Sequence, residues 1–290
     1  MTSSRRSPRA GSTGCWNGCD RVKLSVVIPA RNEEGSVRAT VIGLRDHLDA
    51  AGITNLEILV VDDGSSDRTY ELVAAESRAD PRIRVVRNTG RHGYGRAVAC
   101  GLDHFTGDAV VIYMADASDA PEDVVRYYYI LRDEADCAFG SRFMRGGRVY
   151  DYPRFKLVIN RLANFVIRIM FNMPYNDTTN AFKGYRANVI EGCRPFVSPH
   201  FNLTIEIPLK AIVRGYSYKV IPISWRNRAV GESALKLKEQ GSRYLYTLLT
   251  VWFEWLLVRH DTQRAAGEVF EPWPAEQKPS VSSDAASRLP

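Results

Sequence analysis

The chain has 290 residues, of which 45% are hydrophobic and 25% charged, as is typical of a globular protein with one large domain or one domain plus appendages. Its formal charge of +6 fits an anionic partner such as a nucleotide, a lipid phosphate or a membrane surface, without choosing among them. The five cysteines are odd in number and scattered, which excludes a complete zinc site beside Cys15 and Cys19 and favours the reduced thiols of a cytosolic protein.

Both ends of the chain are polar. Residues 1–22 are rich in Ser, Arg and Gly and lack the apolar segment of a signal peptide, so we expect a disordered basic arm. Residues 261–290 are polar and contain prolines, and we expect a second disordered segment there. Between the ends, the sequence predicts one folded domain over 23–242, followed by an apolar helix over 243–260.

Within the folded domain, short apolar runs rich in β-branched residues alternate with amphipathic stretches. This is the βαβ pattern of an α/β fold with a mostly parallel central sheet and flanking helices. The expected strands are residues 24–28, 56–61, 83–86, 109–113 and 137–140.

Polar motifs follow the first two strands at their carboxyl ends, where open α/β sheets bind ligands. Pro29 is expected to end the first strand, after which Arg31 and Glu33 project into the crevice. Asp62 and Asp63 form an acidic turn after the second strand, where a carboxylate can accept hydrogen bonds from the base or ribose of a nucleotide. The alternative is that either carboxylate only caps a turn or a helix. No G-x-G-x-x-G follows the first strand, which argues against a dinucleotide-binding fold.

A third motif, VVIYMADASDAPE at residues 110–122, carries half of an Asp-x-Asp pair. Met114 occupies the first position and Asp116 the second. Two such carboxylates hold a divalent cation against the diphosphate of a sugar nucleotide in many transferases, so this loop is a candidate cation and diphosphate site.

With these motifs the chain resembles the family 2 glycosyltransferases of the GT-A fold, and among them the dolichyl-phosphate mannose synthases and related polyprenyl-phosphate glycosyltransferases. The similarity extends over about residues 24–258. The matching blocks are PARNE at 29–33, VDDGS at 61–65, MADASDAPED at 114–123, GSRF at 140–143, NRLANF at 160–165, DTTNAFKGYR at 177–186 and NRAVGES at 227–233.

The resemblance implies roles for particular residues, with Asp116, Arg142 and Arg228 as the catalytic group. It assigns the nucleotide to Pro29, Arg31, Glu33, Val61 and Asp63, the diphosphate and cation to Ala115 and Asp116, and the charged groups of the reacting centre to Arg142 and Arg228.

Two positions depart from the family pattern. One is Met114, and the other is Ala234, which replaces the lysine usual after Gly-Glu-Ser. Because Mg²⁺ or Mn²⁺ is commonly held by one or two carboxylates plus phosphate oxygens, Asp116 alone would suffice. Candidate substitutes are Asp119 and Ser118 for the metal, and Lys236 or Lys238 for the missing lysine; the alternative for each is a solvated loop side chain.

Two segments predict contact with a membrane. Residues 155–172 place apolar side chains on one helical face, opposite an arc of Asn and Arg, as in a helix that lies in a membrane interface. Residues 245–258 are apolar nearly all round, with Thr247, Thr250 and Glu254 as a thin polar strip, and are too few to span a bilayer, which takes about 20 residues. We expect an interfacial or oligomer-forming helix there; for both segments the alternative is packing within the protein.

No residue near Arg142 stands out as a general base. A polyprenyl phosphate acceptor removes the need for one, because a phosphate monoester has its second pKa at about 6 and is already an anionic nucleophile at neutral pH. Such an acceptor needs cations instead. The candidate ligands of the lipid phosphate are Arg154, Lys156 and Arg161.

These observations predict an inverting glycosyltransferase that moves one sugar from a nucleotide sugar, GDP-mannose or a UDP-sugar, to dolichyl or polyprenyl phosphate with the help of Mg²⁺ or Mn²⁺. We expect a cytoplasmic protein peripherally associated with the cytosolic face of a membrane, with no nucleic-acid partner, and leave a homo-oligomer open. The alternatives are a family 2 transferase that uses a glycan or other hydroxyl acceptor, and a nucleotide-sugar-binding pseudoenzyme subunit.

Overall fold

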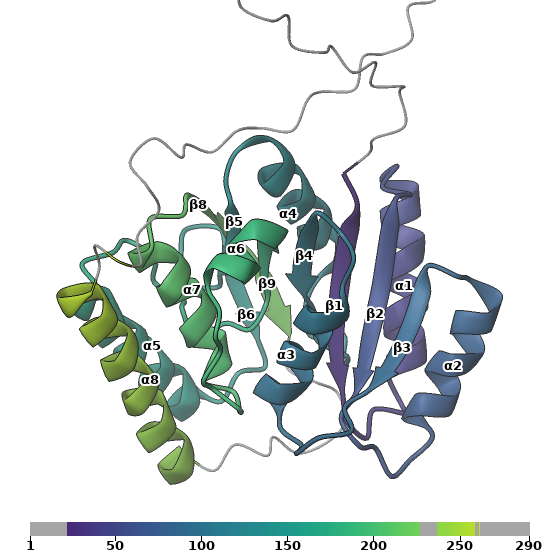
Figure 1. Cartoon of the computed structure of the whole chain (residues 1–290), viewed down its shortest axis with the longest axis horizontal. Helices are drawn as coiled ribbons and strands as arrows, with labels where there is room; N and C mark the ends of the chain where they lie inside the picture. Colours follow the sequence, from purple (N-terminus) through teal and green to yellow (C-terminus); the bar gives the residue numbers. More distant parts are fainter. Residues whose placement is uncertain (1–21, 227–236, 259–260, 262–290) are drawn as a thin grey trace, which may run out of the picture.

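A seven-stranded, mostly parallel sheet forms the centre of the structure, a computed structural model that describes residues 22–226, 237–258 and 261 (Figure 1). The strand order is β3-β2-β1-β4-β7-β5-β8. The strands are β1 (Leu24–Ala30), β2 (Leu56–Asp62), β3 (Ile83–Arg87), β4 (Ala109–Ile112), β5 (Cys137–Ser141), β7 (Lys183–Arg186) and β8 (Tyr218–Pro222). All five strands expected from the sequence are present, and the predicted mostly parallel α/β sheet is confirmed.

One strand of this sheet runs against the others. Strand β7 lies between β4 and β5 and is antiparallel to both, so its first residue, Lys183, pairs with Ile112 at the carboxyl end of β4. A separate two-stranded sheet joins β6 (Arg148–Tyr150) and β9 (Ser224–Arg226). The sequence does not predict these short strands, because they lack the apolar runs that mark β1 and β2.

Pro29 does not end the first strand, contrary to the expectation from the sequence. Strand β1 continues to Ala30, and Pro29 pairs with Val61 of β2. The other neighbour, β4, pairs with β1 only as far as Val27, so Pro29 lies beyond that ladder. A residue without an N–H donor is tolerated at such a position.

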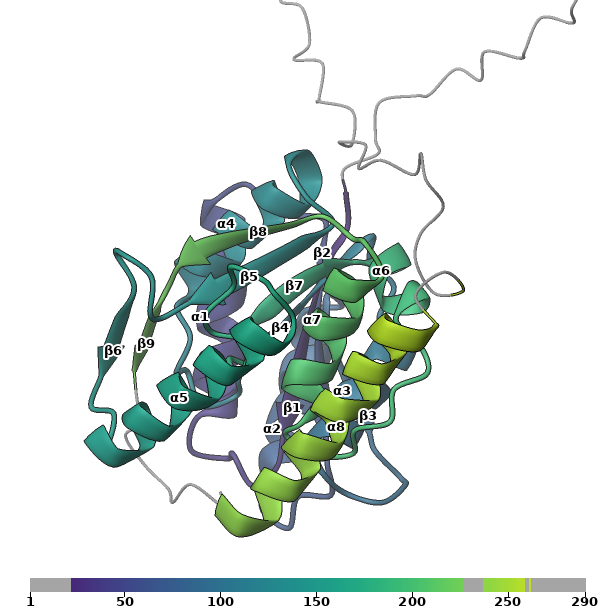
Figure 2. The same cartoon turned by 90° about the vertical axis from the view of Figure 1, so that its left-hand side faces the viewer.

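Helices cover both faces of the sheet. Helices α1, α2 and α4 contribute to the hydrophobic cluster on one face, and α3, α6 and α7 to the cluster on the other, with α5 and α8 outside them (Figures 1 and 2). Their bounds are α1 (Val37–Ala50), α2 (Thr69–Ala79), α3 (Tyr94–His104), α4 (Pro121–Asp133), α5 (Arg154–Met170), α6 (Ala187–Gly192), α7 (Leu203–Val213) and α8 (Leu237–Leu257).

Helix α5 turns its apolar face to solvent. The polar residues of α5 differ in their environment. Asn164 is buried and donates to Thr179 Oγ1 at 2.9 Å, whereas Arg161 and Arg168 are exposed. Met170, at the end of the apolar face, packs against the core, and Ile167 is buried in it, whereas most of that face is exposed. The apolar side chains that are 51–73% exposed are Phe155, Val158, Leu162, Phe165, Val166 and Ile169.

Helix α8 packs on the domain through its polar strip. Thr247 is fully buried and hydrogen bonds with Ser198 and Asn202 at 3.0 and 2.9 Å, and Glu254 pairs with Arg214 at 2.7 Å. The opposite side of the helix therefore remains outside. Its apolar side chains that are 38–71% exposed are Leu245, Tyr246, Leu249, Phe253, Leu256, Leu257 and Val258.

Helices α5 and α8 lie on the same side of the molecule, the side that faces the viewer in Figure 2, and we call their exposed apolar side chains together the apolar platform. The two helices are in contact through Phe171 and Trp255, whose ring centroids are 6.4 Å apart. Among the helices of the described residues, none has both the length and the apolar character needed to cross a bilayer.

The buried hydroxyl of Thr247 generates a test of how α8 is held. We expect Thr247→Val to lower the free energy of unfolding by about 1–3 kcal/mol, because it leaves Ser198 and Asn202 without their buried partner. The matched control is Thr250→Val, whose hydroxyl bonds only to a carbonyl of its own helix, Tyr246, at 2.9 Å. Urea denaturation measures both variants; equal losses would contradict the packing role of the polar strip.

Candidate active site

The polar motifs singled out in the sequence meet at one edge of the sheet. Strands β1, β2, β4 and β5 end there, and the antiparallel strand β7 begins there. This edge therefore brings together the residues that follow β1 and β2, the loop 114–119, the end of β5, and the turn 177–183.

The acidic loop 114–119 is fixed by contacts on both sides. Tyr113 donates its hydroxyl to the carbonyl of Asp119 at 2.6 Å, and Asp119 forms a β-bridge with Trp225 of the β9 strand. The carbonyl of Ala115 accepts from Thr40 at 3.0 Å. Within the loop, the Ser118 N–H donates to Asp116 Oδ1 at 3.1 Å, and this bond holds the Asp116 carboxylate at the site edge.

Asp119 is the most perturbed acid at this edge. Its side chain is buried, and Oδ2 has no hydrogen-bond partner among the described residues. Burial and the nearby charge of Asp116 raise the pKa of Asp119 to about 7, while Arg142 opposes that shift. A buried carboxylate with an unsatisfied oxygen beside a second carboxylate suits a hard divalent cation, which would relieve both penalties.

Few protein side chains in the acidic loop 114–119 could bind a metal ion. Within residues 22–226 and 237–258, no group of three or more His, Cys, Asp or Glu side chains is arranged to hold a metal ion. Asp116 and Asp119 would thus be the two protein ligands, in keeping with the one or two carboxylates that Mg²⁺ commonly takes beside phosphate oxygens.

Arg142 lies next to the acidic loop and is held by Asp177. Its Nε and Nη2 donate to the two carboxylate oxygens of Asp177 at 2.8 and 2.7 Å, and its backbone N–H donates to the same carboxylate at 2.8 Å. Asp177 is fully buried and Arg142 is 7% exposed. The pairing raises the pKa of Arg142 against the opposing effect of burial, so the guanidinium keeps its charge.

Two arginines approach the ring of Phe143. The guanidinium carbons of Arg142 and Arg161 lie 5.3 and 5.8 Å from the centre of that ring. Of the three residues predicted to bind a lipid phosphate, Arg161 thus shares with Arg142 a contact to Phe143. Arg154 and Lys156 lie in the first turn of α5 and make no hydrogen bond or ion pair with other described residues.

The acidic turn after β2 organises the neighbouring loop. Asp63 accepts from Asn88 Nδ2 at 2.7 Å and from the Gly93 N–H at 2.8 Å, and Asp62 accepts from the Ser65 N–H at 3.1 Å. Both carboxylates therefore have structural partners, as the capping alternative expects. Each oxygen still has a further lone pair for a nucleotide.

The remaining predicted nucleotide contacts differ in exposure. Arg31 is exposed, and Glu33 is half-buried with its backbone N–H bonded to Thr69 at 2.8 Å. Val61 is fully buried within the core, where it pairs with Pro29 of β1 and Val86 of β3, and Pro29 is likewise buried. Arg228 and Lys236 lie outside the described residues.

Two charged residues at this edge carry no role in the sequence analysis, although both lie in the block DTTNAFKGYR. They are Asp177 and Lys183. The signal available was their position at either end of a short neutral segment, but Arg142, which pairs with Asp177, and Thr204, one of the acceptors of Lys183, come from other parts of the chain. Lys183 is 1% exposed and donates to the carbonyls of Thr178, Asn180 and Thr204.

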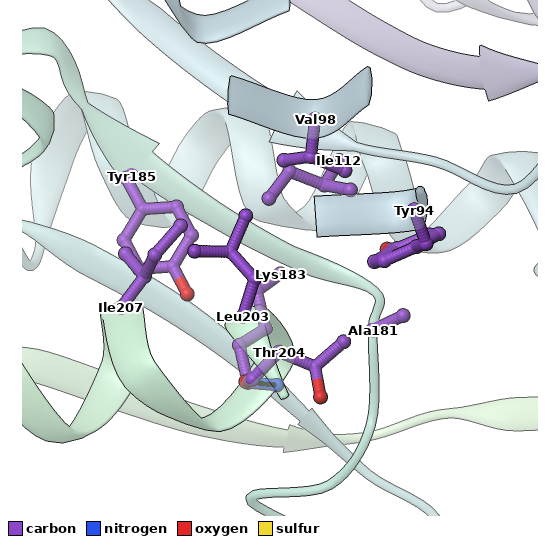
Figure 3. Close-up of a pocket in the computed structure, with 9 residues that line it drawn as sticks. All are labelled: Tyr94, Val98, Ile112, Ala181, Lys183, Tyr185, Leu203, Thr204 and Ile207. Carbon is purple, nitrogen blue, oxygen red and sulfur yellow. Dashed lines mark hydrogen bonds between the residues drawn. The ribbon is translucent and has the colours of Figure 1, made fainter. Parts of the chain in front are cut away.

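A small pocket lies beside Lys183, between α3, β7 and α7 (Figure 3). The hydroxyl of Tyr94 is buried there without a hydrogen-bond partner among the described residues, and burial raises its pKa. The charges of Asp119 and Asp116 contribute to that shift, so the pocket adjoins the acidic loop. Its lining residues are Tyr94, Val98, Ile112, Ala181, Lys183, Tyr185, Leu203, Thr204 and Ile207.

Solved structures confirm the fold predicted from the sequence. Glucosyl-3-phosphoglycerate synthase from Mycobacterium tuberculosis, in complex with Mn²⁺, uridine-diphosphate and phosphoglyceric acid, superposes with a TM-score of 0.61 over 80% of this chain and 78% of that one, at 22% identity. The same enzyme in complex with uridine-diphosphate gives a TM-score of 0.60 over 80% of both chains. The central sheet and its flanking helices are those of the GT-A fold.

Three relatives are similar in sequence. Polyprenol monophosphomannose synthase from Mycolicibacterium smegmatis is 33% identical over 84% of this chain and 90% of that protein. Dolichol-phosphate mannosyltransferase from Pyrococcus furiosus is 31% identical over 79% of this chain, which spans 64% of that protein. Undecaprenyl-phosphate mannosyltransferase from Micrococcus luteus is 27% identical over 74% of this chain and 88% of that protein.

The model of the family described as glycosyl transferase family 2 matches residues 25–193, which is more than half of the chain. This match contains the loop 114–119, Arg142, Asp177 and Lys183. Together with a relative that is 33% identical over most of both proteins, it shows that the chain belongs to glycosyl transferase family 2.

Proposed function

We propose that this family 2 glycosyltransferase transfers one hexose, with inversion, from a nucleotide sugar to a polyprenyl phosphate at the cytosolic face of a membrane. The observation that carries the proposal is the meeting of opposite charges at one sheet edge. Asp116 and Asp119 lie on one side, and the guanidiniums of Arg142 and Arg161 flank Phe143 on the other. A donor diphosphate and an acceptor phosphate need these two environments side by side.

The donor nucleotide would bind across the ends of β1 and β2. Arg31 is exposed and can stack its guanidinium plane on the base, and Asp63 can accept from the base or ribose. Pro29, Glu33, Val61 and Ala115 would complete the nucleotide site, Val61 through its backbone. We propose Arg228 and Lys236 as further cations for the diphosphate.

Asp116 and Asp119 would hold Mg²⁺ or Mn²⁺ between them. When bound, the cation supplies charge neutralisation for the departing diphosphate. The unsatisfied Oδ2 of Asp119 and the mutual repulsion of the two acids support this assignment. In solved structures of the same fold, the glucosyl-3-phosphoglycerate synthase complexes contain Mn²⁺ together with uridine-diphosphate.

The acceptor phosphate would attack the anomeric carbon directly. A phosphate oxygen forms the new bond to that carbon as the bond to the diphosphate oxygen breaks, and the electron pair leaves with the nucleoside diphosphate. No residue has to remove a proton, because the acceptor is already ionised at neutral pH. Arg142 and Arg161 would orient the phosphate, with Arg154 and Lys156 at its approach along α5.

The apolar platform would place the site at a lipid surface. Its side chains are 38–73% exposed, and the exposed Arg161 and Arg168 lie on the same helix as the platform residues of α5. An apolar face bordered by cations binds anionic membranes by burying its side chains among the acyl chains. The free thiols of Cys100, Cys137 and Cys193 are in keeping with a reducing, cytosolic compartment.

The sugar is proposed from the relatives. All three are named as mannose-transferring enzymes acting on polyprenol, dolichol phosphate or undecaprenyl phosphate. We therefore propose mannose, with GDP-mannose as the donor to test first and UDP-glucose as the comparison.

The acidic loop gives the first test of activity. We expect Asp116→Ala to lower transfer from GDP-mannose to farnesyl phosphate by at least about 100-fold, because the departing diphosphate loses its cation. The full chain is assayed with Mg²⁺ or Mn²⁺, and the glycolipid is detected by mass spectrometry. Chelation with EDTA should abolish the reaction, and added Mn²⁺ should restore it.

The matched control is Asp133→Ala, an acid that pairs with Arg132 at the last residue of α4, whereas the acidic loop precedes the first residue of that helix. It should keep wild-type activity. Full activity of Asp116→Ala would remove the metal role. A wild-type chain that labels only an oligosaccharide would indicate a hydroxyl acceptor, and one that binds the nucleotide sugar but makes no product would indicate a pseudoenzyme.

The apolar platform gives a second test. We expect the double variant Phe165→Glu/Ile169→Glu to lower binding to phosphatidylglycerol vesicles by about tenfold or more, since both side chains are more than half exposed and a carboxylate opposes insertion. Vesicle flotation measures the binding, and circular dichroism checks the fold. Tyr129→Glu on α4, 39% exposed, is the control and should bind as wild type. If the double variant floats as well as wild type, or instead dissociates an oligomer, the platform is not the membrane contact.

A further inference from the structure

The guanidinium of Arg142 is oriented by a buried carboxylate. In the bidentate ion pair between the two residues, Arg142 Nε donates to Asp177 Oδ2 at 2.8 Å and Arg142 Nη2 donates to Asp177 Oδ1 at 2.7 Å. Among the described residues, Nη1 makes no hydrogen bond, so this corner of the group is the part left for a ligand. Because Arg142 has many rotamers when unpaired, the bidentate ion pair restricts it to one orientation.

The turn that carries Asp177 is tied to the end of β5. Ser141 donates to Asn176 Oδ1 at 2.5 Å, and Asn180 Nδ2 and the Tyr175 hydroxyl both donate to the Gly140 carbonyl, at 3.4 and 3.1 Å. Arg142 directly follows β5, so these bonds keep Asp177 and Arg142 in register.

Lys183 stabilises the same turn through hydrogen bonds from its side chain. Its ammonium donates to the carbonyls of Thr178 and Asn180 within the turn, and to Thr204 at the start of α7. Three acceptors match the three N–H donors of the charged form. Burial lowers the pKa of Lys183 to about 7, and the negative charge of Asp177 opposes that shift. The turn that carries Asp177 is therefore held by hydrogen bonds from Lys183 at two of its carbonyls.

We propose that Asp177 is a positioning residue that acts through Arg142, holding the guanidinium so that Nη1 meets the phosphate of the acceptor, with Lys183 fixing the turn that carries it. The inference rests on the proposed function, because it assigns the orientation of the proposed phosphate ligand. Its specific consequence is that the carboxylate of Asp177 has no effect on transfer once Arg142 is gone.

The test is a double-mutant cycle in the full-length chain, with Asp177→Asn, Arg142→Met and the double variant. Transfer from GDP-mannose to farnesyl phosphate is measured as kcat and KM for the acceptor, and nucleotide binding as the Kd of GDP. We expect Asp177→Asn to lower kcat/KM for the acceptor by about 10–100-fold, because a misplaced reactant costs on that order. The Kd of GDP should stay within about twofold, and the double variant should be no less active than Arg142→Met alone.

The matched control is Glu206→Gln. Glu206 is also a fully buried carboxylate, bonded to the backbone N–H groups of Val197 and Ser198 at 2.9 and 2.8 Å and paired with Lys210 at 2.7 Å. It lies in α7, away from Arg142. If the loss in Asp177→Asn came only from weaker folding, Glu206→Gln would lose a similar share of activity at a similar melting temperature; we expect it to keep activity within about twofold.

The outcomes separate the two proposals. Additive losses in the cycle, or an active Asp177→Asn, would overturn the positioning role while the proposed function stands. A wild-type chain that neither transfers to farnesyl phosphate nor binds it would overturn both. If Asp177→Asn does not fold, the comparison of Arg142→Met with the double variant still decides, because a further loss in the double variant contradicts an action through Arg142 alone.

Discussion

The buried ion pair between Arg142 and Asp177 is the interaction on which the site depends. It joins the end of β5 to the turn that precedes β7, and so connects two segments separated by a long helix in the chain. Removing one partner of such a pair costs about 3–5 kcal/mol, because the other charge stays buried without compensation. Here Lys183 and Asp119 lie close enough to influence each other and the pair. Two acidic and two basic side chains therefore lie near one another at this edge of the sheet.

The cation site proposed for this loop differs from a complete Asp-x-Asp motif. Met114 removes one carboxylate from the expected position, but the chain turns at Ala117, which has a φ of 55°, and Asp119 is buried close to Asp116. The β-bridge to Trp225 and the hydroxyl of Tyr113 hold Asp119 there. The second carboxylate of the loop thus follows Asp116 along the chain instead of preceding it.

Helices α5 and α8 reverse the usual arrangement of an amphipathic helix. Each directs polar side chains inward, Asn164 in α5 and Thr247 in α8, where they find buried partners. Each helix also buries apolar side chains in the core, Ile167 in α5 and Val251 in α8. Much of the apolar surface of both helices is nevertheless left exposed, because part of the side that faces the core is taken by polar side chains with buried hydrogen-bond partners.

The sequence by itself determined five strands, the mostly parallel sheet and the edge at which the motifs meet, because buried strands are long apolar runs and parallel strands end at a common edge. It also singled out Asp116, Asp119 and Arg142 as candidate site residues. Only the tertiary structure decided that β7 is inserted antiparallel, that Asp177 and Lys183 support Arg142, and that α5 and α8 show their apolar faces to solvent. These features depend on pairs of residues far apart in the chain, and periodicity within one segment carries no information about the partner that lies opposite it in space.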